Sequence, residues 1–113
     1  MTKGKIVLVS FIFDDLSSVK VRPSLCLTDP IGKYNHVILA LITSQIPKKI
    51  LDTDYILDNS HPDFLGSGLK KSSTIKLEQL MTIRISIISR ELGQLSSKTQ
   101  NQLAEILCKV LET

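Results

Sequence analysis

Three runs of β-branched and aliphatic residues fill the first 44 positions of the chain, and turn signals separate them. The runs are KIVLVSFIF (5–13), VKVRPSLCLT (19–28) and HVILALITS (36–44). Short runs of this composition, bounded by polar or Pro/Gly-containing segments, are typical of strands that are buried on at least one face. The segment DPIGKYN is short enough to join the last two runs as an antiparallel hairpin about residues 30–35. The sequence therefore predicts three consecutive strands, two of which form this hairpin.

The middle of the chain is harder to interpret. Residues 45–72 contain Pro47, Pro62 and two glycines, which favours loops with one short strand near DYILD (54–58). Residues 73–83 alternate like a strand, although periodicity alone leaves a helix open. The segment RISIISRELG, 84–93, is open between a helical turn and a strand, and its glycine is expected to end the element.

The C-terminal residues predict a helix over 97–112. Ser97 and Gln100 have the spacing of a capping box. Apolar residues then recur along one helical face, at Leu103, Ile106, Leu107, Val110 and Leu111. Strands followed by a terminal helix indicate a mainly β fold, in which a small, curled, barrel-like sheet packs against a C-terminal α-helix.

Length and composition limit the class of protein. The 113 residues are expected to form one domain, 1–113, and the absence of Trp leaves a core built from Ile, Leu and Val. We expect Cys26 and Cys108 to be buried thiols in a reducing cytoplasm. No segment is long enough to cross a bilayer or reads as a signal peptide, so we expect a cytoplasmic chain with no membrane contact. The net charge of +3 is compatible with a polyanionic partner, but also with an ordinary solvated surface.

Two polar residues at the far ends of the predicted hairpin are candidates for chemistry. Arg22 and Thr43 are equally distant from the turn, so the pairing of the strands brings them opposite or nearly opposite one another. A guanidinium beside a hydroxyl suits a phosphate, and Pro23 would hold the backbone that carries Arg22. Spacing alone leaves a second interpretation open, in which Arg22 forms a structural salt bridge with Asp14 or Asp15.

The remaining charged clusters carry less information. Asp14 and Asp15 have no further ligand at a suitable spacing, so no metal site is predicted. Lys70 and Lys71 form a small basic patch, a kind of feature that is usually only surface. Nothing in the sequence indicates a cofactor.

The order of these segments resembles that of the MazF/PemK toxin family of endoribonucleases. The resemblance rests on GKIVLVSF, KVRPSLCLT, LALITS, GLKKSSTIKLEQLMTI and ELGQLS followed by a terminal helix, and it covers nearly the whole chain. It implies a compact SH3-like β-barrel of the PemK/CcdB type, a homodimer, and sequence-specific, metal-independent cleavage of single-stranded RNA without a cofactor. It also implies a type II toxin–antitoxin system, whose antitoxin covers the RNA groove with an extended, acidic segment.

The resemblance assigns the catalytic roles to Arg22 and Thr43, with Arg22 stabilising charge on the phosphate. The residues that we expect at the RNA are Asp14, Asp15, Lys20, Ser44, Lys70, Lys71, Glu78 and Gln79. No general base can be named from the sequence. The chain departs from the family pattern at Ile12, where a proline is usual, and at Arg84, where an acidic residue is common.

Two other functions remain open at this point. Some relatives of the same fold poison DNA gyrase, a protein target, and cleave nothing. The joint presence of Arg22 and Thr43 favours the nuclease, because a protein-binding toxin does not need the pair. A non-catalytic RNA-binding barrel is disfavoured by the low aromatic content of 4%, since such binding relies on stacking platforms.

Overall fold

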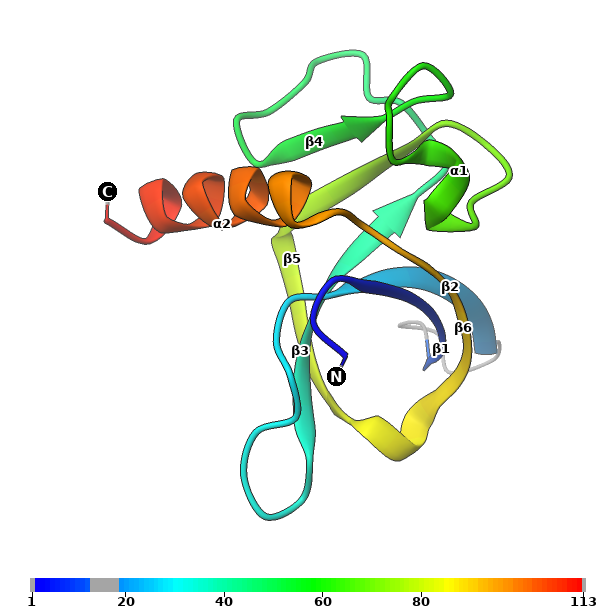
Figure 1. The fold of residues 1–113 in the computed structure, drawn as a ribbon, viewed down its shortest axis with the longest axis vertical. Helices are drawn as coiled ribbons and strands as arrows, with labels where there is room; N and C mark the ends of the chain where they lie inside the picture. The colour runs from blue at the N-terminus through cyan, green and yellow to red at the C-terminus, as the bar shows by residue number, and fades with distance from the viewer. Residues whose placement is uncertain (1, 13–18, 113) are drawn as a thin grey trace.

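Six antiparallel strands form one sheet in the order β4-β5-β3-β2-β1-β6 (Figure 1). The computed structural model describes residues 2–12 and 19–112, with the backbone alone at 11, 12, 19 and 20. The strands are β1 (Lys5–Ile12), β2 (Val19–Cys26), β3 (His36–Thr43), β4 (Asp54–Leu57), β5 (Ser73–Arg84) and β6 (Ile88–Gln94). The helices are α1 (Phe64–Ser67), the 3-10 turn η1 (Ile85–Ile87) and α2 (Ser97–Glu112).

The sheet curls so strongly that its course is barrel-like. β5 continues through η1 into β6, and β6 pairs with β1 at the other side of the sheet (Figure 1). The backbone thus connects β5 to β6 across the curl, although these two strands are not neighbours in the sheet. β4 and β6 remain its edge strands. The prediction of a mainly β, barrel-like fold with a C-terminal helix is confirmed.

Both faces of the sheet are buried, each in a separate aliphatic core. Alternate residues of β1 show the division, since Ile6 enters one core whereas Val7 and Val9 enter the other. The first core lies beneath α2 and comprises Ile6, Leu25, Ala40, Ile42, Leu57, Ile75, Leu77, Leu95 and Leu103. The second lies inside the curl and comprises Val7, Val9, Cys26, Val37, Leu39 and Ile83. The near-continuous apolar character of β1 and β3 follows from this burial on two sides.

The start of α2 is capped one residue earlier than predicted. The hydroxyl that accepts a hydrogen bond from the first turn belongs to Ser96, whose Oγ lies 3.4 Å from the Thr99 N–H, and not to Ser97. Ser96 also donates to the Asp63 carboxylate through both its N–H, at 2.9 Å, and its Oγ, at 2.8 Å. The carboxylate therefore ties the start of α2 to the segment that begins α1.

The second half of α2 runs away from the sheet (Figure 1). Leu103 is buried, but Val110 is 38% exposed and Leu111 76% exposed. Cys108 is exposed, so the prediction of two buried thiols holds for Cys26 and is wrong for Cys108, because the core ends before the last helical turn. In the part of the chain that the structure describes, no helix combines the length and the apolar character that a bilayer span requires.

The structure decides the secondary structure of the two segments for which the sequence allowed either a helix or a strand. Residues 73–84 form the strand β5, and the remainder of the segment 84–93 divides into η1, over 85–87, and the start of β6. Gly93 does not end the element, as β6 continues to Gln94. A Cβ at Gly93 would overlap the backbone of Gly66 and Ser67 in α1, so the glycine allows α1 to pack directly on the strand. The short strand at 54–57 was predicted, whereas α1 was not.

Candidate functional site

A groove of about 810 Å³ opens between β2, β3 and β5 and the segment that leads into β5. Its walls include side chains from four parts of the chain that lie far apart in sequence. The lining includes Arg22, Ser24, Leu41, Thr43, Ser44, Lys70, Lys71, Ser73, Gln79, Leu80 and Met81. The groove thus combines basic, hydroxyl, amide and apolar groups.

The hairpin of β2 and β3 brings Arg22 and Thr43 to this groove. Its register pairs Ser24 with Leu41 and Cys26 with Leu39. Two further residues along the same register place Arg22 opposite Thr43, just beyond the last paired residues. Arg22 is exposed and Thr43 half-buried, and both line the groove. The predicted hairpin is therefore confirmed, and it places the two residues at one site.

Thr43 lies at the point where β3 leaves the sheet. Its Oγ1 accepts a hydrogen bond of 3.2 Å from the Gln45 N–H, which turns the chain after the strand. A hydroxyl that accepts from the backbone keeps its own proton available for donation. Thr43 can therefore donate to an anionic oxygen in the groove without losing its local hydrogen bond.

A bulge in β5 forms the facing wall of the groove. Ala40 pairs with Leu80, but the next residue of β3, Leu41, pairs with Lys76, so residues 77–79 have no partners on β3. Leu77 points into the core, whereas Gln79 lines the groove. The bulge separates the side chains of neighbouring residues, and it brings the Gln79 amide to the site.

Glu78 lies outside the groove. Its carboxylate accepts a hydrogen bond of 3.1 Å from Thr53 Oγ1 and lies 3.3 Å from Lys76 Nζ. The adjacent Leu77 N–H donates to the Thr53 carbonyl at 2.9 Å. Glu78 therefore holds the bulge against the segment before β4.

A buried ion pair lies behind the same bulge. Lys76 Nζ is 2.7 Å from an oxygen of Asp54, whose side chain has no exposed surface. Burial opposes ionisation of Asp54, but the hydrogen bonds from Lys76 and from the Leu51 N–H outweigh it and hold the pKa of this carboxyl below its usual value. The charged pair therefore fixes β4 to β5 beside the groove.

The other predicted site residues divide into three groups. Lys70 and Lys71 are exposed and line the groove together with Ser44. Lys20 pairs with Phe11 in the β1–β2 ladder, and its side chain is outside the described part of the structure. Asp14 and Asp15 also lie outside the described residues.

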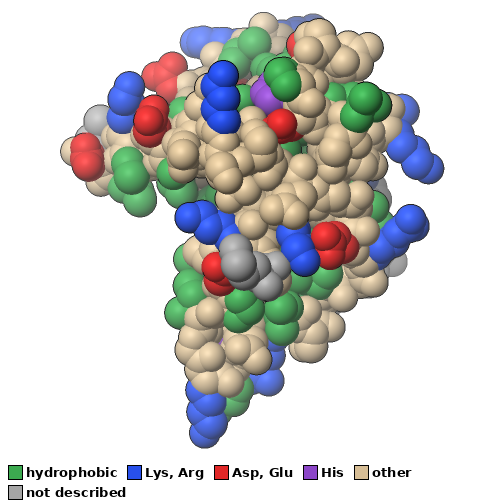
Figure 2. Space-filling view, in the orientation of Figure 1, with side chains coloured by type: hydrophobic (Ala, Val, Ile, Leu, Met, Phe, Trp, Pro, Cys, Tyr) green, Lys and Arg blue, Asp and Glu red, His purple; other side chains and the backbone are tan. Residues whose placement is uncertain are grey.

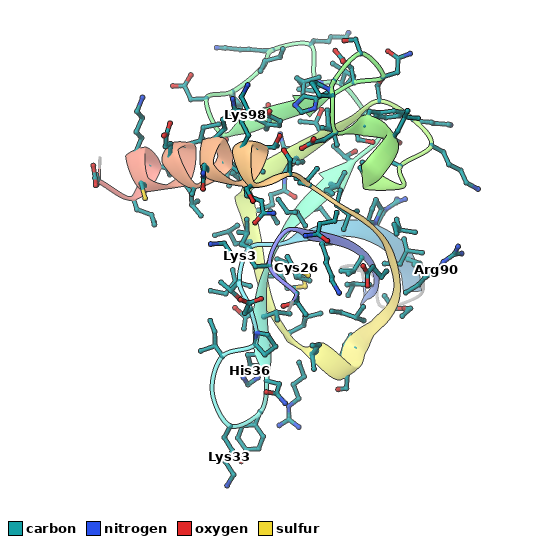
Figure 3. The ribbon with its side chains drawn as sticks, in the orientation of Figure 1. Lys3, Cys26, Lys33, His36, Arg90 and Lys98 are labelled. Carbon is teal, nitrogen blue, oxygen red and sulfur yellow. The ribbon has the colours of Figure 1, made fainter. Side chains whose placement is uncertain are left out.

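A second polar cluster lies at the end of the β2–β3 connection, which projects from the molecule (Figures 1 and 2). Lys33 stands at its tip and His36 nearer the sheet (Figure 3). The Tyr34 ring centroid lies 6.3 Å from that of His36, 5.7 Å from Lys33 Nζ and 4.6 Å from Arg84 Cζ. Arg84, the basic residue at a position that is commonly acidic in the family, therefore makes a cation–π contact that steadies the projecting turn.

The groove contains residues that the sequence did not single out. Leu80 and Met81 contribute exposed apolar surface, and Ser24 contributes a buried hydroxyl. The sequence pattern of β5 did not mark Leu80 and Met81 as groove residues, because the bulge changes which side chains of this strand share a face. Among the described residues, no three His, Cys, Asp or Glu side chains converge into a possible metal cluster. The arrangement suits an extended, anionic ligand with apolar parts.

Comparison with known proteins gives the fold and the family. The family model of the PemK-like, MazF-like toxin of type II toxin–antitoxin systems matches residues 2–111. Among solved structures, the Mycobacterium tuberculosis toxin MazF-mt6 aligns with a TM-score of 0.71 at 23% identity, over 96% of both chains. A mycobacterial endoribonuclease in complex with its cognate antitoxin aligns with a TM-score of 0.71 at 13% identity, over 99% of this chain and 95% of that one.

A third solved structure, described as an Mtb toxin, aligns with a TM-score of 0.61 at 25% identity, over 78% of this chain and 90% of that one. A sequence search of curated proteins gave no match. The family model spans all the elements from β1 to α2, including both strands that carry Arg22 and Thr43. The chain therefore belongs to the PemK-like, MazF-like family of toxins of type II toxin–antitoxin systems.

Proposed function

We propose that this toxin is a sequence-specific endoribonuclease that cleaves single-stranded RNA in the groove of β2, β3 and β5. The observation that carries the proposal is that Arg22 and Thr43 line one groove in a chain of this toxin family. A toxin that only binds a protein target has no need of this pair. The similar mycobacterial structure described as an endoribonuclease supports the same reaction class.

The proposed reaction uses the RNA as its own nucleophile. The 2′-oxygen attacks the adjacent phosphorus as its proton leaves, the bond from phosphorus to the 5′-oxygen breaks, and that oxygen gains a proton. The products are a 2′,3′-cyclic phosphate and a 5′-hydroxyl, and no metal-bound water enters the reaction. Arg22 would stabilise the extra negative charge of the pentacoordinate intermediate, since a well-placed donor contributes on the order of 3 kcal/mol. Thr43, supported by Ser44, would donate to the phosphate and orient it.

The other groove residues fit roles in binding RNA. Lys70 and Lys71 would contact phosphates on either side of the cleaved bond. The Gln79 amide has both a donor and an acceptor, so it can read the edge of a base and contribute sequence preference. We retain Asp14, Asp15, Lys20 and Glu78 as proposed RNA contacts in the bound state.

We also propose a cognate antitoxin as a partner. A similar toxin structure contains its cognate antitoxin, and the groove here is basic at Arg22, Lys70 and Lys71 and apolar at Leu80 and Met81. An extended acidic segment with apolar side chains would complement these surfaces. Such a segment would exclude RNA from the same groove.

A homodimer is the assembly that we propose for the chain in the cytoplasm. Leu80, Met81 and Ile87 are 44%, 41% and 47% exposed, and Leu111 is 76% exposed. An isologous interface would bury part of this apolar surface. Sedimentation at micromolar concentration should show twice the mass of the chain, and a monomer would count against this assembly.

Mapping of RNA ends tests the proposed reaction. Purified protein is incubated with a long single-stranded RNA in excess chelator, and the new ends should lie at one recurrent short sequence and carry 2′,3′-cyclic phosphates. Folded Arg22→Ala should cleave at least 100-fold more slowly, because it lacks the charge at the phosphate. Arg90→Ala is the matched control, as Arg90 is an exposed arginine of β6 outside the groove lining (Figure 3). RNA that stays intact with the unaltered protein, or full activity of Arg22→Ala, would refute the proposal.

A further inference from the structure

The hydroxyl of Ser24 is a feature of the groove that the proposed reaction does not use. Ser24 has no exposed surface, and its Oγ makes no hydrogen bond to any residue that the structure describes. It nevertheless belongs to the lining of the groove. Leaving a buried hydroxyl without a partner destabilises a fold, so an orphaned group of this kind calls for a physical explanation.

The surroundings of Ser24 explain why it has no partner within the chain. Its neighbours across the sheet are Val7 on β1 and Leu41 on β3, and neither side chain carries a polar atom. Two other buried serines, Ser67 and Ser73, donate to backbone carbonyls two or three residues earlier in the chain. An extended central strand offers Ser24 no such local carbonyl, because its backbone groups are occupied by the ladder.

The position of Ser24 relates it to the proposed catalytic pair. Side chains two residues apart on a strand share a face, so Ser24 follows Arg22 on the groove side of β2. On β3, Thr43 stands two residues beyond Leu41, the partner of Ser24. The Ser24 hydroxyl therefore lies one strand step further into the groove than Arg22 and Thr43, about 6.6 Å along the strand.

We propose that Ser24 is an additional RNA-binding residue, and that its Oγ donates a hydrogen bond to a phosphate oxygen of RNA held in the groove. The inference rests on the proposed endoribonuclease function and deepens it. A phosphate is the ligand that this part of the groove fits, because Arg22, Lys70 and Lys71 supply positive charge around it. A hydrogen bond from a buried hydroxyl to an anionic oxygen is stronger than one to a neutral acceptor, and it satisfies the orphaned group. Because Ser24 has no exposed surface in the free protein, the half-buried Leu41 beside it would have to shift for the oxygen to reach the hydroxyl.

The replacement Ser24→Ala separates binding from folding. Since the hydroxyl has no partner in the free protein, the variant should unfold at the same urea concentration as the unaltered protein, or a higher one. Its affinity for an RNA made non-cleavable by 2′-O-methylation should fall about tenfold, the value of one charge-assisted hydrogen bond. Ser73→Ala is the matched control: its hydroxyl also lines the groove, but it donates to a backbone carbonyl. Ser73→Ala should therefore lose stability, while its affinity changes less than that of Ser24→Ala.

Salt dependence adds a readout that a general loss of structure does not reproduce. Ser24→Ala removes no charge, so its plot of log affinity against log salt should be displaced downward and stay parallel to that of the unaltered protein. Unchanged affinity of stable Ser24→Ala, beside a loss of binding in Arg22→Ala, would overturn the role of Ser24 alone. If the unaltered protein and Arg22→Ala bind RNA equally well, or if neither binds it, the proposed function is refuted, and the Ser24 contact with it. Destabilisation of Ser24→Ala would also overturn the inference, because it would show that the hydroxyl has a structural partner.

Discussion

The three basic residues of the groove predict how strongly salt should weaken RNA binding. Arg22, Lys70 and Lys71 line the groove, and each phosphate that a cation neutralises on a single strand contributes about −0.7 to the slope of log affinity against log salt. These three contacts therefore contribute about −2 to the slope, which alone weakens binding roughly 20-fold between 50 and 200 mM salt, and a phosphate contact of Lys20 would add to it. The double replacement Lys70→Ala with Lys71→Ala should make the slope shallower by about 1.4, the share of the two lysines. Fluorescence anisotropy of a 2′-O-methylated oligonucleotide across a salt series measures both.

A control must remove the same charge from a different surface. Lys98 (Figure 3) and Lys109 are exposed residues of α2, and neither lines the groove. Replacing both with Ala changes the net charge by the same amount, so the control slope should remain that of the unaltered protein. If the slopes of the two double variants become shallower by the same amount, then the overall charge and not the groove governs binding. If the groove variant keeps the full slope, the RNA lies elsewhere on the toxin.

Three further predictions concern the fold that supports the groove. Gly93→Ala should lower stability by about 2–3 kcal/mol, because the added methyl overlaps the α1 backbone, and thermal unfolding should shift down by on the order of 10 °C. In the native protein a maleimide should modify Cys108 and leave Cys26 unmodified, since burial raises the pKa of the Cys26 thiol to about 11; equal labelling would contradict the assigned burial. Asp54→Asn should cost about 2 kcal/mol at pH 7, because Lys76 loses its closest partner. The native pKa of Asp54 lies below its unfolded value, so this cost should be complete above about pH 4 and should shrink as the pH falls further; a cost that grows in acid would refute the assignment.

Local patterns explain the parts of the fold that the sequence predicted. Equal distances of Arg22 and Thr43 from one turn determine their register, because an antiparallel hairpin has only one register for a given turn. The helical spacing of Leu103 and Ile106 likewise predicted α2. The exposure of Cys108 was not predictable in the same way, since a periodic pattern marks the apolar face of a helix but not the point at which its core ends.

The approach of Lys70 and Lys71 to the groove depends on contacts between distant segments. The segment of residues 58–72, which contains α1, brings them there, and several local hydrogen bonds, such as those from Ser60 to Asp58 and from Asn59 to Ser72, shape its loops. Loop geometry of this kind depends on the surface that the loop meets, so the residues alone indicated a basic patch, and only the resemblance to the toxin family placed it at the RNA.

The bulge in β5 is the feature on which the composition of the site depends most. In a regular strand, Gln79 would share a face with Leu77, and Leu77 is buried in the core. Three residues without partners on β3 break this alternation, so that Gln79 lines the groove while Leu77 remains buried and Glu78 binds Thr53 and Lys76. Because of this bulge, three consecutive residues lie in three different places: Leu77 in the core, Glu78 in the polar contacts behind the groove wall, and Gln79 in the groove. The facing wall of the groove is therefore held from behind in two ways, by the packing of Leu77 in the core and by the hydrogen bonds and ion pair of Glu78, and both leave Gln79 available to a ligand.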